Sequence, residues 1–195
     1  MGDGELMVIL GPPAVGKMTV GRAVCARSDF RLFHNHHMIE PLREVFDFGT
    51  PPFQTLCHEF RRRVMEEAAA SGVRLVFTVT LRVDDAEHVA ALESWVAPFS
   101  SAGLRVSFVQ LSADLDVRLA RNRTTARLDA KPSKRDLAWS DANVREWDQY
   151  RTTTDPDLPS AADELLSAHP CLSLDNSGLT AEEAAARILA WRGDN

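Results

Sequence analysis

A glycine-rich segment near the beginning of the chain most limits the fold that this sequence can adopt. Residues 10–24 read LGPPAVGKMTVGRAV. They follow the apolar run 6–10, which has the composition of a buried strand, and a helical pattern extends from Gly16 to about residue 27. A glycine-rich turn between a strand and a helix directs backbone N–H groups and the positive end of the helix dipole to one point. The segment is therefore predicted to bind phosphate.

The segment nearly matches the phosphate-binding motif G-x-x-x-x-G-K-[ST]. Gly11, Gly16 and Lys17 have the required spacing, and Lys17 is expected to reach the β- and γ-phosphates of a nucleotide. Met18, however, occupies the hydroxyl position, and Thr19 comes one place later. Because that hydroxyl usually ligates Mg²⁺ and a methionine does not, the ion would be held more through water, phosphate oxygens or other side chains. The alternative is a strand–turn–helix unit with a surface lysine.

Apolar runs and helical patterns alternate along the rest of the chain. Further strands are expected at residues 31–33, 73–80, 104–111 and 171–174. Helices are expected in the second half of segment 34–46, over about 53–71 and 84–100, from about residue 114, within 139–150, and after Thr180, which forms a capping box with Glu183. This alternation predicts a parallel sheet covered by helices on both faces. No linker or repeat interrupts it, so residues 1–195 are expected to form one domain.

Composition argues against several other classes of protein. No apolar run approaches the roughly 18–20 residues of a membrane helix, so no membrane partner is expected. The formal net charge of −6 argues against nucleic acid as a partner. The N-terminal segment MGDGELMVILG carries acids before its apolar run and therefore predicts a first strand, not a signal peptide. Cys25, Cys57 and Cys171 are far apart in the sequence, as expected for unpaired thiols in the cytoplasm.

Several segments resemble those of small-molecule P-loop kinases. GKMTVGR, residues 16–22, is similar to the loop of shikimate and gluconate kinases, and its late hydroxyl is similar to G-K-G-T of adenylate-kinase-like enzymes. LSADLDVRLARNR, residues 111–123, resembles their helix entering the lid, and residues 172–189 resemble their last strand, adenine loop and closing helix. A similar PPAVGK…LFHNH pattern is typical of a loose group of bacterial P-loop proteins described as kinase-like or ATPase-like.

This resemblance implies a fold, a cofactor pair and a set of nucleotide-binding residues. The implied fold class is α/β: the three-layer P-loop nucleoside triphosphate hydrolase fold, with a parallel five-stranded sheet in the order 2-3-1-4-5, a helical substrate-binding region at about 34–72 and a lid at about 121–136. The implied cofactors are ATP and Mg²⁺, with Thr19 contacting a phosphate near the metal. The expected nucleotide-binding residues are Gly11, Pro13, Ala14, Val15, Gly16, Lys17, Met18, Thr19, Arg118 and Asn176.

Four arginines in and after the helix near residue 114 are expected to lie at the lid: Arg118, Arg121, Arg123 and Arg127. Their spacings of 3, 2 and 4 do not form one stripe of an ideal helix. Arg121 and Arg123 are expected to contact phosphate and to neutralise charge in the transition state, whereas Arg118 could stack on adenine and Arg127 is a candidate for substrate binding. The alternative is an exposed basic face that pairs with nearby aspartates.

Three histidines mark the expected acceptor side. The segment 34–40, HNHHMIE, follows a predicted strand, at the sheet edge where open parallel sheets bind ligands. A histidine can accept the proton of an attacking hydroxyl near neutral pH, so His34 and His36 are predicted to be catalytic and His37 to contact the substrate. The alternatives are a metal site, an HNH-type nuclease site, or polar residues that pack the end of the strand.

The same segment departs from the shikimate kinases, which carry D-x-D-x-x-I-E. Ile39 and Glu40 align with that motif, but histidines stand where both acids should be, and residues 78–82 replace a Gly-Gly-Gly sequence. Shikimate is therefore not an expected substrate. Arg61, in a Phe-Arg pair similar to one in that family, and Arg82, after the third strand, are further substrate candidates; Arg61 could instead belong to a solvated helix face. The four tryptophans, Trp95, Trp139, Trp147 and Trp191, are expected in the core or at caps.

Together these features favour an ATP-dependent kinase that phosphorylates a hydroxyl of a small molecule, as a cytoplasmic monomer or homodimer. The alternative is an ATP- or GTP-binding module that hydrolyses slowly and signals to a partner, which the missing acids favour slightly. A nucleic-acid end kinase would need a basic track that the composition does not supply.

Overall fold

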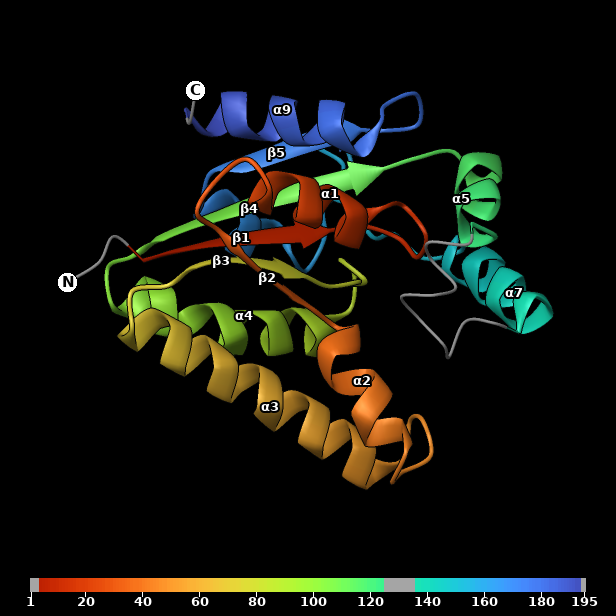
Figure 1. Ribbon diagram of the computed structural model, residues 1–195, viewed down its shortest axis with the longest axis horizontal. Helices are drawn as coiled ribbons and strands as arrows, with labels where there is room; N and C mark the ends of the chain where they lie inside the picture. Colours follow the sequence, from red (N-terminus) through yellow and green to blue (C-terminus); the bar gives the residue numbers. More distant parts are fainter. Residues whose placement is uncertain (1–3, 125–135, 194–195) are drawn as a thin grey trace.

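The computed structural model describes residues 4–124 and 136–193, and its centre is a parallel sheet of five strands (Figure 1). The strands are β1 (Glu5–Leu10), β2 (Arg31–His34), β3 (Arg74–Thr78), β4 (Arg105–Ser112) and β5 (Cys171–Asp175). Their order is β2-β3-β1-β4-β5, and every neighbouring pair is parallel. The predicted fold class and strand order are confirmed.

Eight helices of the described residues surround the sheet. They are α1 (Lys17–Cys25), α2 (His36–Arg43), α3 (Pro51–Ala70), α4 (Ala86–Ser101), α5 (Leu115–Asn122), α7 (Leu137–Trp147), α8 (Asp163–Ser167) and α9 (Ala181–Arg192). Helices α3 and α4 lie on one face of the sheet and α1 and α9 on the other, whereas α5 and α7 lie beyond one end of the strands (Figure 1). The expected substrate-binding region corresponds to α2 and α3. The expected lid begins at the end of α5, and its residues 125–135 lie outside the described residues.

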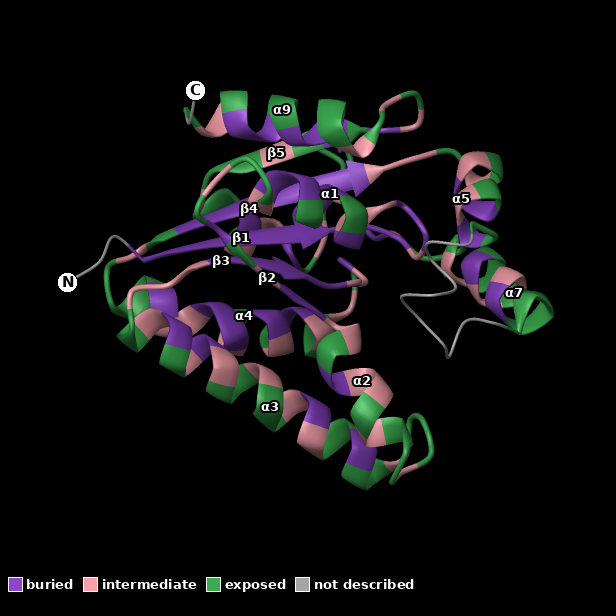
Figure 2. Ribbon diagram, viewed as in Figure 1, coloured by how far each residue is buried: buried purple, intermediate pink, exposed green. Residues whose placement is uncertain are grey.

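The central strand β1 shows why the sheet is covered on both sides. All six of its residues are buried, and the five apolar ones that follow Glu5 alternate between two apolar clusters. Leu6, Val8 and Leu10 pack with side chains of α3 and α4, whereas Met7 and Ile9 pack with side chains of α1 and α9. Figure 2 shows β1, β3 and β4 mostly buried and the outer sides of α3 and α9 exposed. An unbroken apolar run is what a strand between two helical layers requires.

Helix boundaries follow local chemistry. Pro51 occupies the first turn of α3 after an extended Thr50, Asp85 caps α4 by accepting from the Glu87 and His88 N–H groups, and Thr180 caps α9 in the predicted capping box. Three predictions differ from the structure. Helix α2 spans His36–Arg43 and so begins before the expected second half of segment 34–46, β3 ends at Thr78 instead of residue 80, and the short helix α8 was not expected. No helix among residues 4–124 and 136–193 is both long and apolar enough to cross a membrane.

Candidate active site

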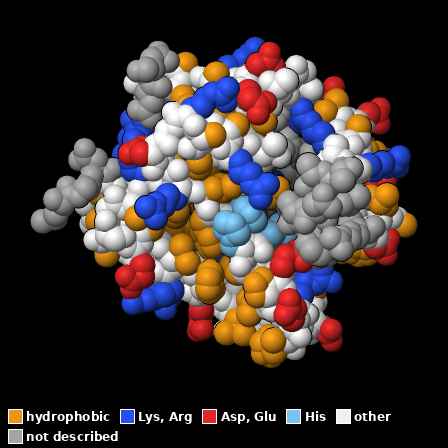
Figure 3. Space-filling view, in the orientation of Figure 1, with side chains coloured by type: hydrophobic (Ala, Val, Ile, Leu, Met, Phe, Trp, Pro, Cys, Tyr) orange, Lys and Arg blue, Asp and Glu red, His pale blue; other side chains and the backbone are white. Residues whose placement is uncertain are grey.

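A cleft of about 850 Å³ opens at the carboxyl ends of β1, β2 and β3. This is the sheet edge at which parallel α/β proteins bind ligands, and the volume is typical of a small-molecule site. The cleft brings together the loop between β1 and α1, the end of β2 with the start of α2, and parts of α5, α7 and the loop before α9. Figure 3 shows histidine side chains in the middle of one face, bordered by basic and apolar side chains.

The glycine-rich segment forms a tight loop that only particular residues can adopt. Gly11 and Gly16 have φ angles of 138° and 106°, in the region that favours glycine. A Cβ atom at Gly11 would lie 2.3 Å from the Leu111 carbonyl oxygen, so a larger residue does not fit there. No side chain in the described part of the chain caps α1 at Gly16. The first N–H groups of this helix therefore face the cleft without a side-chain acceptor, as an anion site requires.

Lys17 lies within the curve of this loop. Its Nζ atom donates to the Gly11 carbonyl over 2.6 Å and to the Pro12 carbonyl over 2.8 Å. The ammonium group is thus held at the concave side of the loop, close to where the backbone N–H groups of a phosphate loop converge. In this position the Lys17 ammonium can exchange the two carbonyl oxygens for phosphate oxygens.

Arg121 and Asn176 fasten the loop before α9 to the phosphate loop. Asn176 Nδ2 donates to the Val15 carbonyl over 2.9 Å, and Arg121 Nη1 donates to the same carbonyl over 3.0 Å. Arg121 Nη2 also donates to the Asn176 carbonyl over 2.7 Å. Burial lowers the pKa of Arg121, and the charge of Asp175 opposes this shift. Arg121 lines the cleft, but these bonds commit its guanidinium to holding three segments together.

Of the three histidines predicted to form the acceptor site, two line the cleft and one does not. His34 is the last residue of β2 and is buried, and His36 begins α2; both line the cleft. His36 Nδ1 lies 2.8 Å from Glu40 Oε1, so the neutral ring carries its proton on Nδ1 and an acceptor lone pair on Nε2. His37 is exposed and lies outside the lining, with its ring 3.7 Å from that of His34. Burial, and next the charge of Arg22, lower the pKa of His37.

Arg118 on α5 and Arg123 directly after it lie outside the cleft lining and connect this region to α7 and its C-terminal end. Arg118 is buried, donates from Nε to the Ala113 carbonyl over 3.0 Å and pairs with Asp148. Arg123 is exposed and pairs with Asp141 over 2.6 Å. The structure therefore places both side chains in helix packing and not beside the phosphate loop.

Of the remaining arginine candidates, Arg61 and Arg82 lie away from the cleft lining. The Arg61 guanidinium stacks 4.8 Å from the Trp95 ring centre, and burial lowers the pKa of Arg61 to about 10. Arg82 pairs with Asp85 and lies over the ring of Tyr150. Arg127 lies outside the described residues.

Comparison with solved structures independently gives the same fold. No family model matches the sequence, and no curated protein matches it. Among solved structures, a sugar kinase from Janibacter sp. HTCC2649 aligns with a TM-score of 0.60 and 15% identity over 97% of this chain and 94% of its own. A putative kinase from Chloroflexus aurantiacus j-10-fl gives a TM-score of 0.64 and 14% identity, covering 96% and 98% of the two chains. The shikimate kinase from Acinetobacter baumannii in complex with shikimate gives 0.56 and 17%, covering 98% and 94%.

The fold is that of the small-molecule P-loop kinases. At these identities the likeness is one of fold, and the resemblance predicted from the motifs is confirmed at that level. Kinases of this fold use a nucleoside triphosphate together with Mg²⁺. The loop around Lys17 fits the phosphates of such a nucleotide.

The same lining fits a directly bound Mg²⁺ poorly. The described lining residues include Lys17, Arg22, Arg43 and Arg121 but no aspartate or glutamate. Met18 is buried where a metal-ligating hydroxyl usually stands, while Thr19 faces the cleft. Among the described residues no group of three or more His, Cys, Asp or Glu side chains could hold a metal ion. A divalent cation here would depend on phosphate and water ligands.

Sequence reasoning missed several residues of the cleft wall: Arg22, Arg43, Phe48, Thr78, Thr80, Trp139, Asn143 and Trp147. Trp95 is buried as expected, whereas Trp139 and Trp147 lie in the first and last turns of α7 and line the cleft instead of the core. The spacing of Trp139, Asn143 and Trp147 puts them on one side of α7 and was the available signal. Which way that side faces depends on how α7 packs on α5.

Proposed function

We propose that this protein transfers the γ-phosphoryl group of ATP to a hydroxyl of a small molecule. The observation that carries the proposal is the lining of a single cleft by the phosphate loop and by the His36 side chain that Glu40 orients. A phosphate donor site and a polarised proton acceptor are the two elements that such a transfer needs.

On the donor side, the loop N–H groups and Lys17 bind the β- and γ-phosphates. Asn176 and Arg121 keep the loop before α9 against Val15, so the nucleotide meets a preformed wall. The excess of basic side chains in the described lining stabilises negative charge on the transferring oxygens. Mg²⁺ held through phosphate and water would add to this charge neutralisation, and Thr19 supplies a hydroxyl in the loop.

On the acceptor side, His36 serves as the general base. The acceptor oxygen bonds to the γ-phosphorus, the bond to the bridging oxygen of ADP breaks, and the hydroxyl proton passes to Nε2 of His36. The Glu40 carboxylate, 2.8 Å from Nδ1, stabilises the imidazolium that results. His34 and the Thr78 and Thr80 hydroxyls line the same wall and orient the acceptor.

The lining also indicates the kind of acceptor. Ile39 and Phe48 supply apolar surface beside Arg43, and the described lining has no carboxylate to bind an amine. We therefore infer an uncharged or anionic hydroxyl compound with an apolar portion. We further infer a cytoplasmic setting, which the three free cysteines favour, and no nucleic-acid partner, which the net charge of −6 favours.

The test begins with binding and proceeds to turnover. Calorimetry with a non-hydrolysable ATP analogue and Mg²⁺ measures the donor site, and ADP release is then followed against sugars, nucleosides and hydroxylated antibiotics. With an active acceptor, His36→Gln should lower kcat by about 10²- to 10⁴-fold with little change in analogue affinity. His58→Gln, a histidine on α3 outside the lining, is the control and should retain kcat. Equal kcat in wild type and His36→Gln would remove His36 from the mechanism.

A second candidate function is an ATP- or GTP-binding module with slow hydrolysis. The observation that favours it is the lack of any carboxylate base in the described lining. Analogue binding without acceptor-stimulated ADP release across the panel supports the module, whereas stimulation by any acceptor supports the kinase.

A further inference from the structure

A second pocket, of about 760 Å³, lies at the opposite end of the sheet. It is formed where β1, β3 and β4 begin, together with the C-terminal end of α9. The six residues of β1 separate it from the phosphate loop by roughly 17 Å, at about 3.3 Å per residue. The pocket is therefore distinct from the candidate active site.

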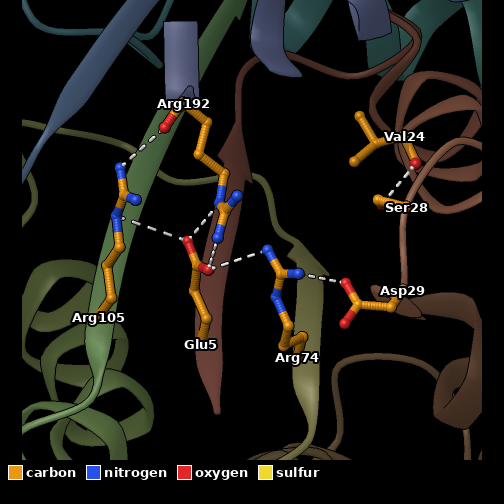
Figure 4. Close-up of polar contacts among 7 residues, drawn as sticks. All are labelled: Glu5, Val24, Ser28, Asp29, Arg74, Arg105 and Arg192. Carbon is orange, nitrogen blue, oxygen red and sulfur yellow. Dashed lines mark hydrogen bonds and ion pairs between the residues drawn. The ribbon is translucent and has the colours of Figure 1, made fainter. Parts of the chain in front are cut away.

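A row of charged residues crosses the sheet at this pocket. Glu5 on β1 is directly in register with Arg74 on β3 and with Arg105 on β4, so the three side chains share one face. Figure 4 shows that Arg192, from the end of α9, reaches the same carboxylate. Glu5 is buried, and it pairs with Arg74 over 3.3 Å, with Arg105 over 3.6 Å and with Arg192 at shorter range.

Positive charge exceeds negative charge in this pocket. Four arginines line it, Arg31, Arg74, Arg105 and Arg192, against two carboxylates, Glu5 and Asp29. The excess of two positive charges is concentrated on a chain whose formal net charge is −6. A guanidinium has five N–H donors and a carboxylate accepts about four hydrogen bonds, so the carboxylates cannot satisfy all the donors.

Arg105 and Arg31 have the weakest contacts among these arginines. Arg105 is 45% exposed, and its contacts are long: 3.6 Å from Nε to Glu5 and 3.5 Å from Nη2 to the Arg192 carbonyl. Arg31 is exposed and forms no ion pair with residues 4–124 or 136–193. Small residues line the pocket beside them: Gly4, Gly72 and Gly103. A Cβ atom at Gly103 would meet nothing within 4 Å, so the pocket is open at this residue.

We propose that this pocket binds a compact dianion that carries a phosphate group. Guanidinium groups bind phosphate through paired N–H donors, and the charge excess matches that of a phosphate monoester. The buried Glu5 holds Arg74 and Arg192 in place, while Arg105 and Arg31 turn their donors to the ligand. The volume admits a small organic ester as well as the inorganic ion.

The test measures phosphate binding in the Lys17→Ala protein, whose active site is weakened. Calorimetry with inorganic phosphate and with glycerol 3-phosphate should show saturable binding of at least one of them. Arg105→Ala in the same background should weaken it about tenfold or more, because a charge-assisted contact is lost. Arg187→Ala, an exposed arginine on α9 outside the pocket, should leave it unchanged. Tighter binding of the ester identifies an organic phosphate, and equal or tighter binding of phosphate identifies the free ion.

A second variant separates an anion site from a merely structural ion-pair cluster. Glu5→Gln removes the carboxylate that competes for the guanidiniums, so it should tighten phosphate binding severalfold and make phosphate raise the Tm more than in the parent protein. A structural cluster would show destabilisation alone. The proposal is overturned when neither inorganic phosphate nor glycerol 3-phosphate binds to the Lys17→Ala protein. It is also overturned when the added Arg105→Ala variant, shown to be folded by circular dichroism, binds the same probe as tightly as its parent.

Discussion

Lys17 is the residue on which the nucleotide site most depends. Its ammonium group lies at the loop carbonyls and is positioned to exchange them for phosphate oxygens. Lys17→Ala should weaken binding of a non-hydrolysable ATP analogue about a hundredfold or more, since charge-assisted hydrogen bonds to two phosphates are lost. Calorimetry measures the affinity, and Lys17→Arg, which keeps the charge, should lose less of it. An Ala variant that binds within twofold of wild type would contradict the assignment of the loop.

Met18 stands at the position where a phosphate loop usually carries a metal-ligating hydroxyl. Met18 is 9% exposed, so its side chain contributes to packing, and it replaces a side chain that would carry a hydroxyl. Met18→Ser should lower the free energy of unfolding by about 2 kcal/mol or more. It should also lower the Mg²⁺ concentration needed for half-maximal analogue binding, because a hydroxyl replaces a thioether. Met18→Ala leaves a similar space without a hydroxyl, so an equal Mg²⁺ requirement in the two variants would exclude metal ligation at this position.

The start of α9 is an element on which stability and the candidate site both depend. Thr180 Oγ1 accepts from the Glu183 N–H over 3.2 Å, and hydrogen bonds from Thr180 lower the pKa of Glu183. Thr180 and Ala181 also line the cleft. Thr180→Ala should lower the free energy of unfolding by about 1 kcal/mol, measured by urea denaturation, and should weaken analogue binding slightly. Thr55→Ala, at an exposed position within α3, is the control, where alanine should leave stability equal or slightly higher.

The elements differ in how far local sequence determines them. The apolar run predicted strand β1, and the Thr180–Glu183 pair predicted the start of α9. Both predictions succeeded because apolar character and capping act within a few residues. The short helix α8 was missed because Ala162 and Leu166 are buried against the α3–α4 side of the sheet, which is a tertiary effect. The position of Trp139 and Trp147 in the cleft wall was not predicted for a related reason: helical spacing shows that they share a side of α7, but not what that side faces.

At the level of the whole molecule, the two pockets differ in how visible they are in the sequence. The phosphate loop is one continuous segment, so its residues could be predicted together. The charged row joins Glu5, Arg74, Arg105 and Arg192, which are brought together only by strand register and by the position of the last turn of α9. Helix α9 connects the pockets, since its first residues line the cleft and its last line the arginine pocket. The arginine pocket could therefore be recognised only from the structure, because its charged residues come from distant segments of the chain.

Stability of the whole molecule should decrease as the pH falls below neutrality. Burial lowers the pKa of both His37 and His88; the charges of Arg22 and Arg82 respectively add to these shifts, and Glu87 partly opposes the second. An unfolded histidine has a pKa of about 6.5, so between that pH and the lower folded values the unfolded chain binds more protons than the native state. Protonation therefore favours unfolding, and the stability present above about pH 6.5 is lost as the pH falls towards the folded pKa values.

Urea denaturation at pH 7.5 and pH 5.5 measures this loss. The wild-type midpoint should be lower at pH 5.5, and the double variant His37→Gln with His88→Gln should show a smaller difference between the two pH values. Carboxylates whose pKa values are lowered by hydrogen bonds, Asp175 by Ser177 and Glu183 by Thr180, retain their contribution in this interval, because it is lost only below the unfolded values of about 4. The interval therefore isolates the histidines. A double variant with the wild-type pH dependence would show that other groups cause it.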